Sequence, residues 1–311
     1  GLWVPCMTLL ALFLGLIIER LVTRLLHLRE PRWLDGYFDW GFQHFQIPSQ
    51  PGGKPFTLLT LVFCLLPVLP VAVLSAMFGD VLLSLPYLVF AIFVLIFSLG
   101  PRDLKDEVDD YCAAVDRGDT EEAKRIAKAI LEDDAASRPG PAREQLEEAI
   151  LTQSNNRLFG VIFWFMVLGP AGAWLFRVSD LMRRRAVFES ERLCPIDGQG
   201  RSYLVATRRL HAILSWLPAR ITALLFPLAG SFDEAMAGWR EFYASAKGEI
   251  LLMNDHVLVC VGKGALRPLL AGAPEGNPDT WTARATLRLV MRTLVVWLVV
   301  MSVMTLLGVM A

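Results

Sequence analysis

Long apolar runs alternate with shorter polar segments along the chain, and this pattern predicts helices embedded in a membrane. Each run approaches the roughly 20 residues that a helix needs to cross a hydrocarbon core about 30 Å thick. We expect the first run to be a retained span, because it lacks a basic N-terminal region and a small-residue cleavage site. The runs are Leu2–Ile18, Pro55–Gly79, Val81–Pro101, Leu158–Phe176 and Thr293–Ala311.

Basic residues indicate which ends of these helices face the cytoplasm. The Gly79–Asp80 tip between the second and third runs and the C-terminal run carry no Lys or Arg, whereas the segment joining the first two runs is rich in them. By the positive-inside rule, we expect a multi-pass protein of a bacterial inner membrane, with its polar segments mainly cytoplasmic. The basic residues of the joining segment are Arg20, Arg24, Arg29, Arg32 and Lys54.

The run Leu158–Phe176 leaves two topologies open. A full crossing would place the many arginines that follow it outside, against the positive-inside rule. Gly169-Pro170-Ala171-Gly172 interrupts the run, as in broken helices that are buried in protein. We therefore favour a re-entrant or bundle-embedded helix pair, and the alternative is a true crossing with a return through Ala212–Gly230.

The polar segment 102–156 predicts a small cytoplasmic module of helices. Gly118 suits the position just after a helix end, and Asp119 with Glu122 resembles a capping box at the next helix start. Pro141 then opens a further helix. The predicted helices are Asp103–Arg117, Glu121–Leu131 and Ala142–Gln153.

Apolar residues recur at helical spacing between Leu210 and Leu228, and a polar group lies on the other side. Arg209, Trp216 and Arg220 fall within about 40° of one another at about 100° per residue. Guanidinium groups bind phosphate or carboxylate bidentately, so this face suits an anionic ligand. The alternative is an interfacial helix whose arginines reach lipid headgroups.

Composition supports the membrane interpretation and excludes some functions. Hydrophobic residues make up 54% of the chain, charged residues 20%, and the mean hydropathy is +0.46. With 30 basic and 31 acidic side chains, the chain lacks the basic field that a nucleic-acid partner needs. The five cysteines form no CxxC pair and the four histidines show no metal-ligand spacing, so we predict unpaired thiols and no metal site.

One segment resembles a known family. Ser215–Leu225 is similar to the Asn-Trp-Ile-Pro-Ala-Arg-Leu-Thr-Ala-Leu-Leu signature of the CobD/CbiB superfamily. Within that superfamily, Ile18-Glu19-Arg20-Leu21, the segment Leu214–Trp239 and the single C-terminal span most resemble the AmpE family. Further segments follow in the order of the superfamily, namely Arg102–Ile130, Glu144–Phe165 and Gly172–Met182.

The resemblance implies two different functions. An AmpE-like protein would modulate signalling linked to peptidoglycan recycling and β-lactamase induction, without catalysis. The enzymatic branch would use ATP and Mg²⁺ to join an aminopropanol phosphate to a corrinoid carboxylate. This chain departs from that branch, with Asn155 and Phe159 at two acidic positions and Glu132-Asp133-Asp134-Ala135 near the place of an Arg-Asp-Thr element. The loss of carboxylates removes candidate Mg²⁺ ligands, so no metal site is expected, and ATP and Mg²⁺ are implied as cofactors only by the resemblance to the enzymatic branch.

These observations predict an all-α integral membrane protein with about four to six membrane-embedded helices and a small cytoplasmic helical module. The expected segments are membrane helices in 1–101, the module in 102–156, a re-entrant or amphipathic core in 157–230, a connecting region in 231–286 and a C-terminal span in 287–311. The expected partners are the bilayer, an anionic or muropeptide-like ligand and a second copy of the chain. The candidate ligand-binding residues are Arg102, Asp103, Asp106, Asn155, Asn156, Arg177, Asp180, Arg209, Trp216 and Arg220, with an ion-pair ladder as the alternative for Arg177, Asp180 and Arg184 and helix capping for Asn155 and Asn156.

Overall fold

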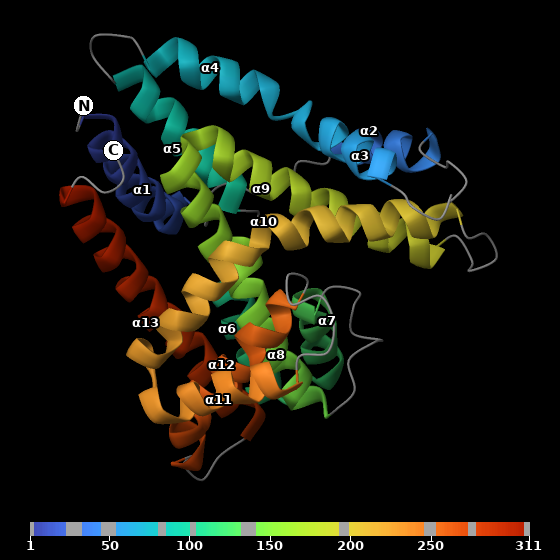
Figure 1. Cartoon of the computed structure of the whole chain (residues 1–311). Helices are drawn as coiled ribbons and strands as arrows, with labels where there is room; N and C mark the ends of the chain where they lie inside the picture. The colour runs from blue at the N-terminus through green and yellow to red at the C-terminus, as the bar shows by residue number, and fades with distance from the viewer. Residues whose placement is uncertain are drawn as a thin grey trace. The chain divides into compact units, whose positions relative to one another are not determined.

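A computed structural model describes residues 3–22, 33–44, 54–79, 85–99, 104–131, 141–192, 199–245, 253–272 and 278–307. Every regular element in these ranges is a helix (Figure 1). The protein is therefore an all-α membrane protein, as predicted.

The chain divides into two compact units. Unit 1 comprises Gly1–Pro101, Gly160–Leu214 and Thr305–Ala311, and unit 2 comprises Arg102–Phe159 and Ser215–Met304. Unit 1 contains α1 (Trp3–Val22), α2 (Trp33–His44), α3 (Lys54–Leu65), α4 (Leu69–Gly79), α5 (Leu85–Leu99), α9 (Gly160–Arg192) and the first part of α10 (Gln199–Ala229). Unit 2 contains α6 (Leu104–Asp116), α7 (Thr120–Leu131), α8 (Ala142–Ser154), the π-helix η2 (Asn155–Phe159), the rest of α10, α11 (Phe232–Ser245), α12 (Asn254–Ala271) and most of α13 (Pro278–Leu306).

Four candidate spans are long and apolar enough to cross a membrane, and one of them, Pro86–Asp116, includes residues 100–103, which lie outside the described residues. Thr8–Ile18 is a shorter apolar helix segment. The predicted C-terminal run is helical as far as Leu306, where α13 ends, and that helix begins at Pro278. The four stretches are Pro86–Asp116, Ala142–Glu189, Tyr203–Ala229 and Pro278–Thr305.

The predicted run Pro55–Gly79 is not one helix. It forms α3 and α4, which are separated by a turn at Leu66–Val68. Pro67 lacks an N–H, so the carbonyl four residues earlier, that of Phe63, loses its helical donor. The Tyr37 hydroxyl donates to that carbonyl over 2.8 Å, and the rings of Tyr37 and Phe63 stack at 4.1 Å. The carbonyl that the break leaves free is thus hydrogen-bonded within unit 1.

A second break occurs where the sequence predicts an interruption. Gly169 has φ of 66°, a left-handed conformation that favours glycine, and Pro170 follows it. The helix bends there and continues to Arg192, beyond the end of the apolar run at Phe176. The predicted interruption is confirmed, and the topology relative to a bilayer stays a prediction.

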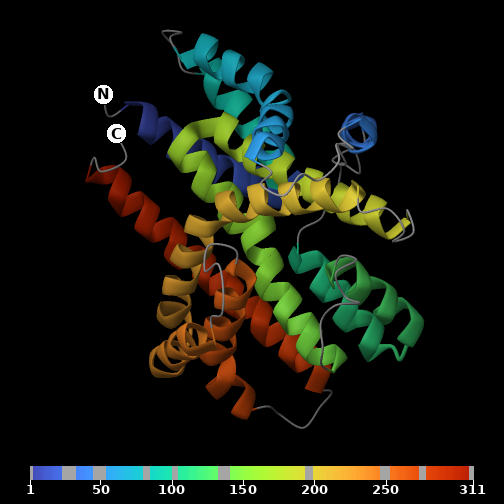
Figure 2. The ribbon, with the colours of Figure 1, turned by 45° about the vertical axis from the view of Figure 1, so that its right-hand side comes forward.

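The polar module of unit 2 has the local structure that the sequence predicts. Gly118 has φ of 75°, and the backbone N–H of Glu122 donates to the Asp119 carboxylate over 3.1 Å. Helices α6 and α7 form a hairpin, and α7 packs against α8 (Figure 2). Pro141 directly precedes α8, also as predicted.

The predicted connecting region contains two tightly packed helices, α11 and α12. A Cβ atom on Gly238 would lie 2.3 Å from the Cys260 carbonyl oxygen, and one on Gly264 would lie 2.3 Å from that of Glu234. Glycine is required at both positions because the two backbones approach so closely. Residues of α8, α10 and α13 complete this buried core, among them Leu151, Phe226 and Leu289.

Candidate functional site

The structure assigns the predicted site residues to both units, and each unit is described separately. Unit 2 contains Asp106, Asn155, Asn156, Trp216 and Arg220, and unit 1 contains Arg177, Asp180 and Arg209. Arg102 and Asp103 lie outside the described residues. Asp106 and Arg209 are exposed on α6 and α10, and their part in a site stays a prediction.

In unit 2, the structure brings Trp216 and Arg220 together on α10. The Arg220 guanidinium carbon lies 5.5 Å from the Trp216 ring centroid and 5.8 Å from that of Phe242 on α11. The guanidinium also donates to the side-chain oxygen of Asn254, the first residue of α12. Asn254 is uncharged, so this hydrogen bond orients the guanidinium without cancelling its charge.

The second feature of unit 2 is the π-helix, where Asn155 is 1% exposed. Its side-chain amide donates to the Ser215 hydroxyl over 2.8 Å. Its Oδ1 atom is buried and has no hydrogen-bond partner within the described residues. Single π-turns often occur at functional sites, and a buried acceptor of this kind suits a donor from a ligand or water. Asn156 is also buried.

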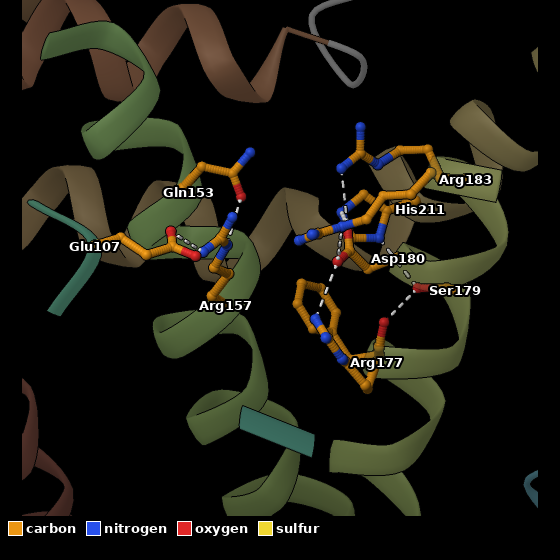
Figure 3. Close-up of polar contacts among 10 residues, drawn as sticks. Glu107, Gln153, Arg157, Arg177, Ser179, Asp180, Arg183 and His211 are labelled. Atoms are coloured by element: carbon orange, nitrogen blue, oxygen red, sulfur yellow. Dashed lines mark hydrogen bonds and ion pairs between the residues drawn. The ribbon is translucent and has the colours of Figure 1, made fainter. Parts of the chain in front are cut away.

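The structure contains a buried ion pair in unit 2 that was not predicted from the sequence. Arg157 in the π-helix lies 2.6 Å from the Glu107 carboxylate of α6 and donates to the Gln153 side-chain oxygen over 3.2 Å (Figure 3). Both charged side chains are almost fully buried, so the pair ties α6 to the end of α8. Glu107 and Arg157 are 50 residues apart, and no local pattern connects them.

In unit 1, Asp180 lies at the centre of a cluster of basic side chains (Figure 3). Its carboxylate lies 3.4 Å from the Arg177 guanidinium, 2.8 Å from that of Arg183 and 2.7 Å from that of Arg184. The His211 ring on α10 is 3.9 Å away and also lies 3.1 Å from the Ser179 hydroxyl. The predicted contact of Arg177 and Arg184 with Asp180 is confirmed. Arg183, three residues from Asp180, and His211, which only folding brings near, were not predicted.

The metal-binding side chains among the described residues do not form a magnesium site. No group of three His, Cys, Asp or Glu side chains in the described part of the chain lies close enough to hold a metal ion. Glu107 is engaged by Arg157, and Asn155 offers one neutral oxygen. Hard cations prefer several carboxylate oxygens, and these residues do not provide them. The arrangement around Arg220 suits recognition of an anion.

Comparison with known proteins gives one family and two relatives. Residues 7–311 match the family described as "Regulatory signalling modulator protein AmpE". A "Cobalamin biosynthesis protein CobD" of Chromobacterium violaceum is 27% identical over 286 residues, which cover 89% of this chain and 86% of the relative. A protein of the same description from Stutzerimonas stutzeri is 27% identical over 184 residues, 58% of this chain and 57% of the relative. No solved structure matches at a significant level.

Proposed function

The chain belongs to the AmpE family, and from this premise we propose that it is a regulatory protein of the bacterial inner membrane that binds an anionic ligand. The ligand would be a small phosphate or carboxylate compound, such as a muropeptide-like molecule. Binding would modulate signalling linked to peptidoglycan recycling and β-lactamase induction. No catalytic step is assigned to the protein.

The arrangement of Arg220 carries this proposal. A charged side chain inside a candidate membrane helix is costly and is usually retained for a partner or ligand. Asn254 orients the guanidinium, and the faces of Trp216 and Phe242 flank it. A planar guanidinium has the fork geometry that matches both oxygens of a carboxylate or phosphate.

The second candidate function is an ATP- and Mg²⁺-dependent ligase that forms an amide bond. Its support is the similarity to proteins described as CobD. Against it stand Asn155 and Phe159 at positions where the enzymatic branch has carboxylates, since these changes remove metal ligands.

The two functions are distinguished by purification and complementation. The full chain is purified and incubated with ATP, Mg²⁺, an aminopropanol phosphate and a corrinoid carboxylate, and products are measured by mass spectrometry. The regulator proposal predicts no amide product above a no-protein control. It also predicts that the parent chain, but not Arg220→Ala at equal membrane abundance, restores normal β-lactamase induction in a strain lacking its own copy. Turnover to the amide would instead establish the ligase.

A further inference from the structure

One exposed face of α13 changes abruptly from basic to apolar. Exposed side chains recur along it at intervals of three or four residues, so they form a single stripe along the helix. The N-terminal half of the stripe is entirely arginine, and the C-terminal half is entirely valine. In order, the stripe consists of Arg284, Arg288, Arg292, Val295, Val299 and Val303.

The three arginines make different contacts with the rest of the protein. Arg284 lies 2.9 Å from the Asp116 carboxylate of α6. Arg288 lies with its guanidinium carbon 4.7 Å from the ring of Trp281 and donates to the Arg284 carbonyl over 3.3 Å. These contacts fix the position of Arg288, and neither of them involves a carboxylate. Arg292, the closest of the three to the valines, is exposed on the same face.

The valines identify the surface that faces hydrocarbon. Val295, Val299 and Val303 are 60%, 56% and 48% exposed, and together they form an apolar strip within the candidate span Pro278–Thr305. In water such a strip would be unfavourable, whereas lipid chains cover it at no cost. The bilayer is therefore the natural partner for this half of the face.

The length of α13 brings its arginine half to the edge of the hydrocarbon. The helix has 29 residues and is about 43 Å long at about 1.5 Å per residue, about 13 Å more than a core about 30 Å thick requires. With Leu306 at one edge of the core, Arg288 lies close to the other edge and Arg292 lies about one turn deeper. Side chains of a helix lean toward its N-terminus, and long arginine side chains near a helix end extend to the membrane interface. Both guanidiniums are therefore within reach of the lipid phosphates.

We propose that the arginine half of this face, Arg288 with Arg292, is a binding site for the phosphate groups of anionic lipids. The edge of the hydrocarbon then lies near Arg288, and the Arg292 side chain extends back to it. Charge complementarity selects the lipid. Both guanidiniums attract a headgroup with net negative charge, whereas they attract a zwitterionic headgroup only weakly. Arg284 contributes less because Asp116 already balances its charge.

Native mass spectrometry of the full chain in detergent tests the proposal. The protein is titrated with phosphatidylglycerol, with phosphatidylcholine, and with inorganic phosphate in the presence of phosphatidylglycerol. We expect the parent to retain phosphatidylglycerol in preference to phosphatidylcholine. Removing both charges, in Arg288→Gln with Arg292→Gln, should lower that preference by roughly fivefold per arginine. Millimolar phosphate should leave the lipid adducts in place, because a free ion lacks the acyl chains that the valines contact.

Matched variants separate charge from folding. Arg292→Gln alone should lower the preference by roughly fivefold with an unchanged melting temperature, since Arg292 is exposed. Arg292→Lys should keep the preference, because a headgroup needs positive charge rather than a planar fork. Arg125→Gln on the exposed surface of α7 should have no effect. Equal retention of the two lipids by the parent, an unchanged preference in the double variant, or displacement of the lipid by phosphate would each overturn the proposal.

Discussion

The indole N–H of Trp164 donates to the carbonyl oxygen of Leu214 over 3.0 Å, and that carbonyl is the one that Pro218 leaves without a helical donor. In the apolar interior of a membrane protein an unpaired carbonyl is costly, since water does not reach it. In the same way, the Tyr37 hydroxyl donates to the Phe63 carbonyl, which Pro67 leaves without a helical donor. At both prolines, an aromatic side chain from another helix thus satisfies the carbonyl that the proline leaves free.

Trp164→Phe should therefore destabilise the protein, because the Leu214 carbonyl loses its donor. The expected cost of the lost hydrogen bond is about 1 kcal/mol. It is measured as a lower melting temperature of the protein in detergent. A double-mutant cycle with Pro218→Ala isolates the hydrogen bond from packing, since alanine restores a helical N–H to the same carbonyl. An equal cost of Trp164→Phe in both backgrounds would show that only ring packing matters.

The contact of α11 with α12 predicts a steric effect. Gly238→Ala places a Cβ 2.3 Å from the Cys260 carbonyl oxygen, a backbone atom that cannot move aside without shifting the helix. We expect a loss of about 1–3 kcal/mol in the free energy of unfolding, with Gly264→Ala similar. Chemical or thermal unfolding measures it.

Gly272→Ala is the matched control, because a Cβ there meets no heavy atom within 4 Å. Its stability should stay close to that of the parent. Comparable losses in Gly238→Ala and Gly272→Ala would contradict a close helix approach and indicate a general effect of removing glycine.

Local chemistry explains which parts of the fold could be predicted. The α6–α7 turn could be predicted because its determinants are local. Gly118 takes the left-handed conformation at the end of α6, and the Asp119 carboxylate caps the start of α7. Gly169 before Pro170 gives the bend of α9 for the same reason. The break at Pro67 was missed because an uninterrupted apolar run hid a proline whose freed carbonyl Tyr37 satisfies from another helix.

The candidate site was predictable only where its residues share one helix. Trp216 and Arg220 are four residues apart on α10, so helical geometry predicts their contact. Asn254 and Phe242 complete the surroundings of Arg220, but they come from helices in a segment where the sequence shows no motif. Glu107 opposite Arg157 is likewise a contact that only tertiary packing creates.

The thiol of Cys260 should react slowly at neutral pH. Burial, and then the negative charge of Glu241, raises the pKa of Cys260 to about 11. The thiolate is the reactive form, so alkylation should rise about tenfold per pH unit between pH 8 and about 10. A variant with Cys6, Cys64, Cys112 and Cys194 changed to Ser isolates this thiol for labelling with iodoacetamide. Fast labelling at about pH 7.5, on a still folded protein, would contradict the raised pKa.

Reporter fusions test the predicted sidedness. Fusions at Gly79 and after Ala311 should report the periplasm, because no Lys or Arg flanks those ends. Fusions near Gly118 and Gln199 should report the cytoplasm. A periplasmic signal at Gln199 would contradict the re-entrant topology and support a full crossing of Leu158–Phe176.

Substitution of Arg220 tests whether its guanidinium binds an anionic ligand. Arg220→Lys keeps the positive charge but loses the planar fork that binds two oxygens of an anion. A ligand-binding role predicts impaired β-lactamase induction at near-normal membrane abundance. Arg220→Ala should impair induction at least as strongly, because it removes both charge and fork.

A purely interfacial role predicts the opposite result for lysine, since a lysine side chain reaches lipid headgroups as an arginine does. Arg125→Ala is the control, because Arg125 pairs with Glu122 of its own helix at an exposed position on α7. That variant should resemble the parent in both assays. If Arg220→Lys also resembles the parent in abundance and induction, Arg220 does not bind an anion through its fork, and α10 is better described as an interfacial helix.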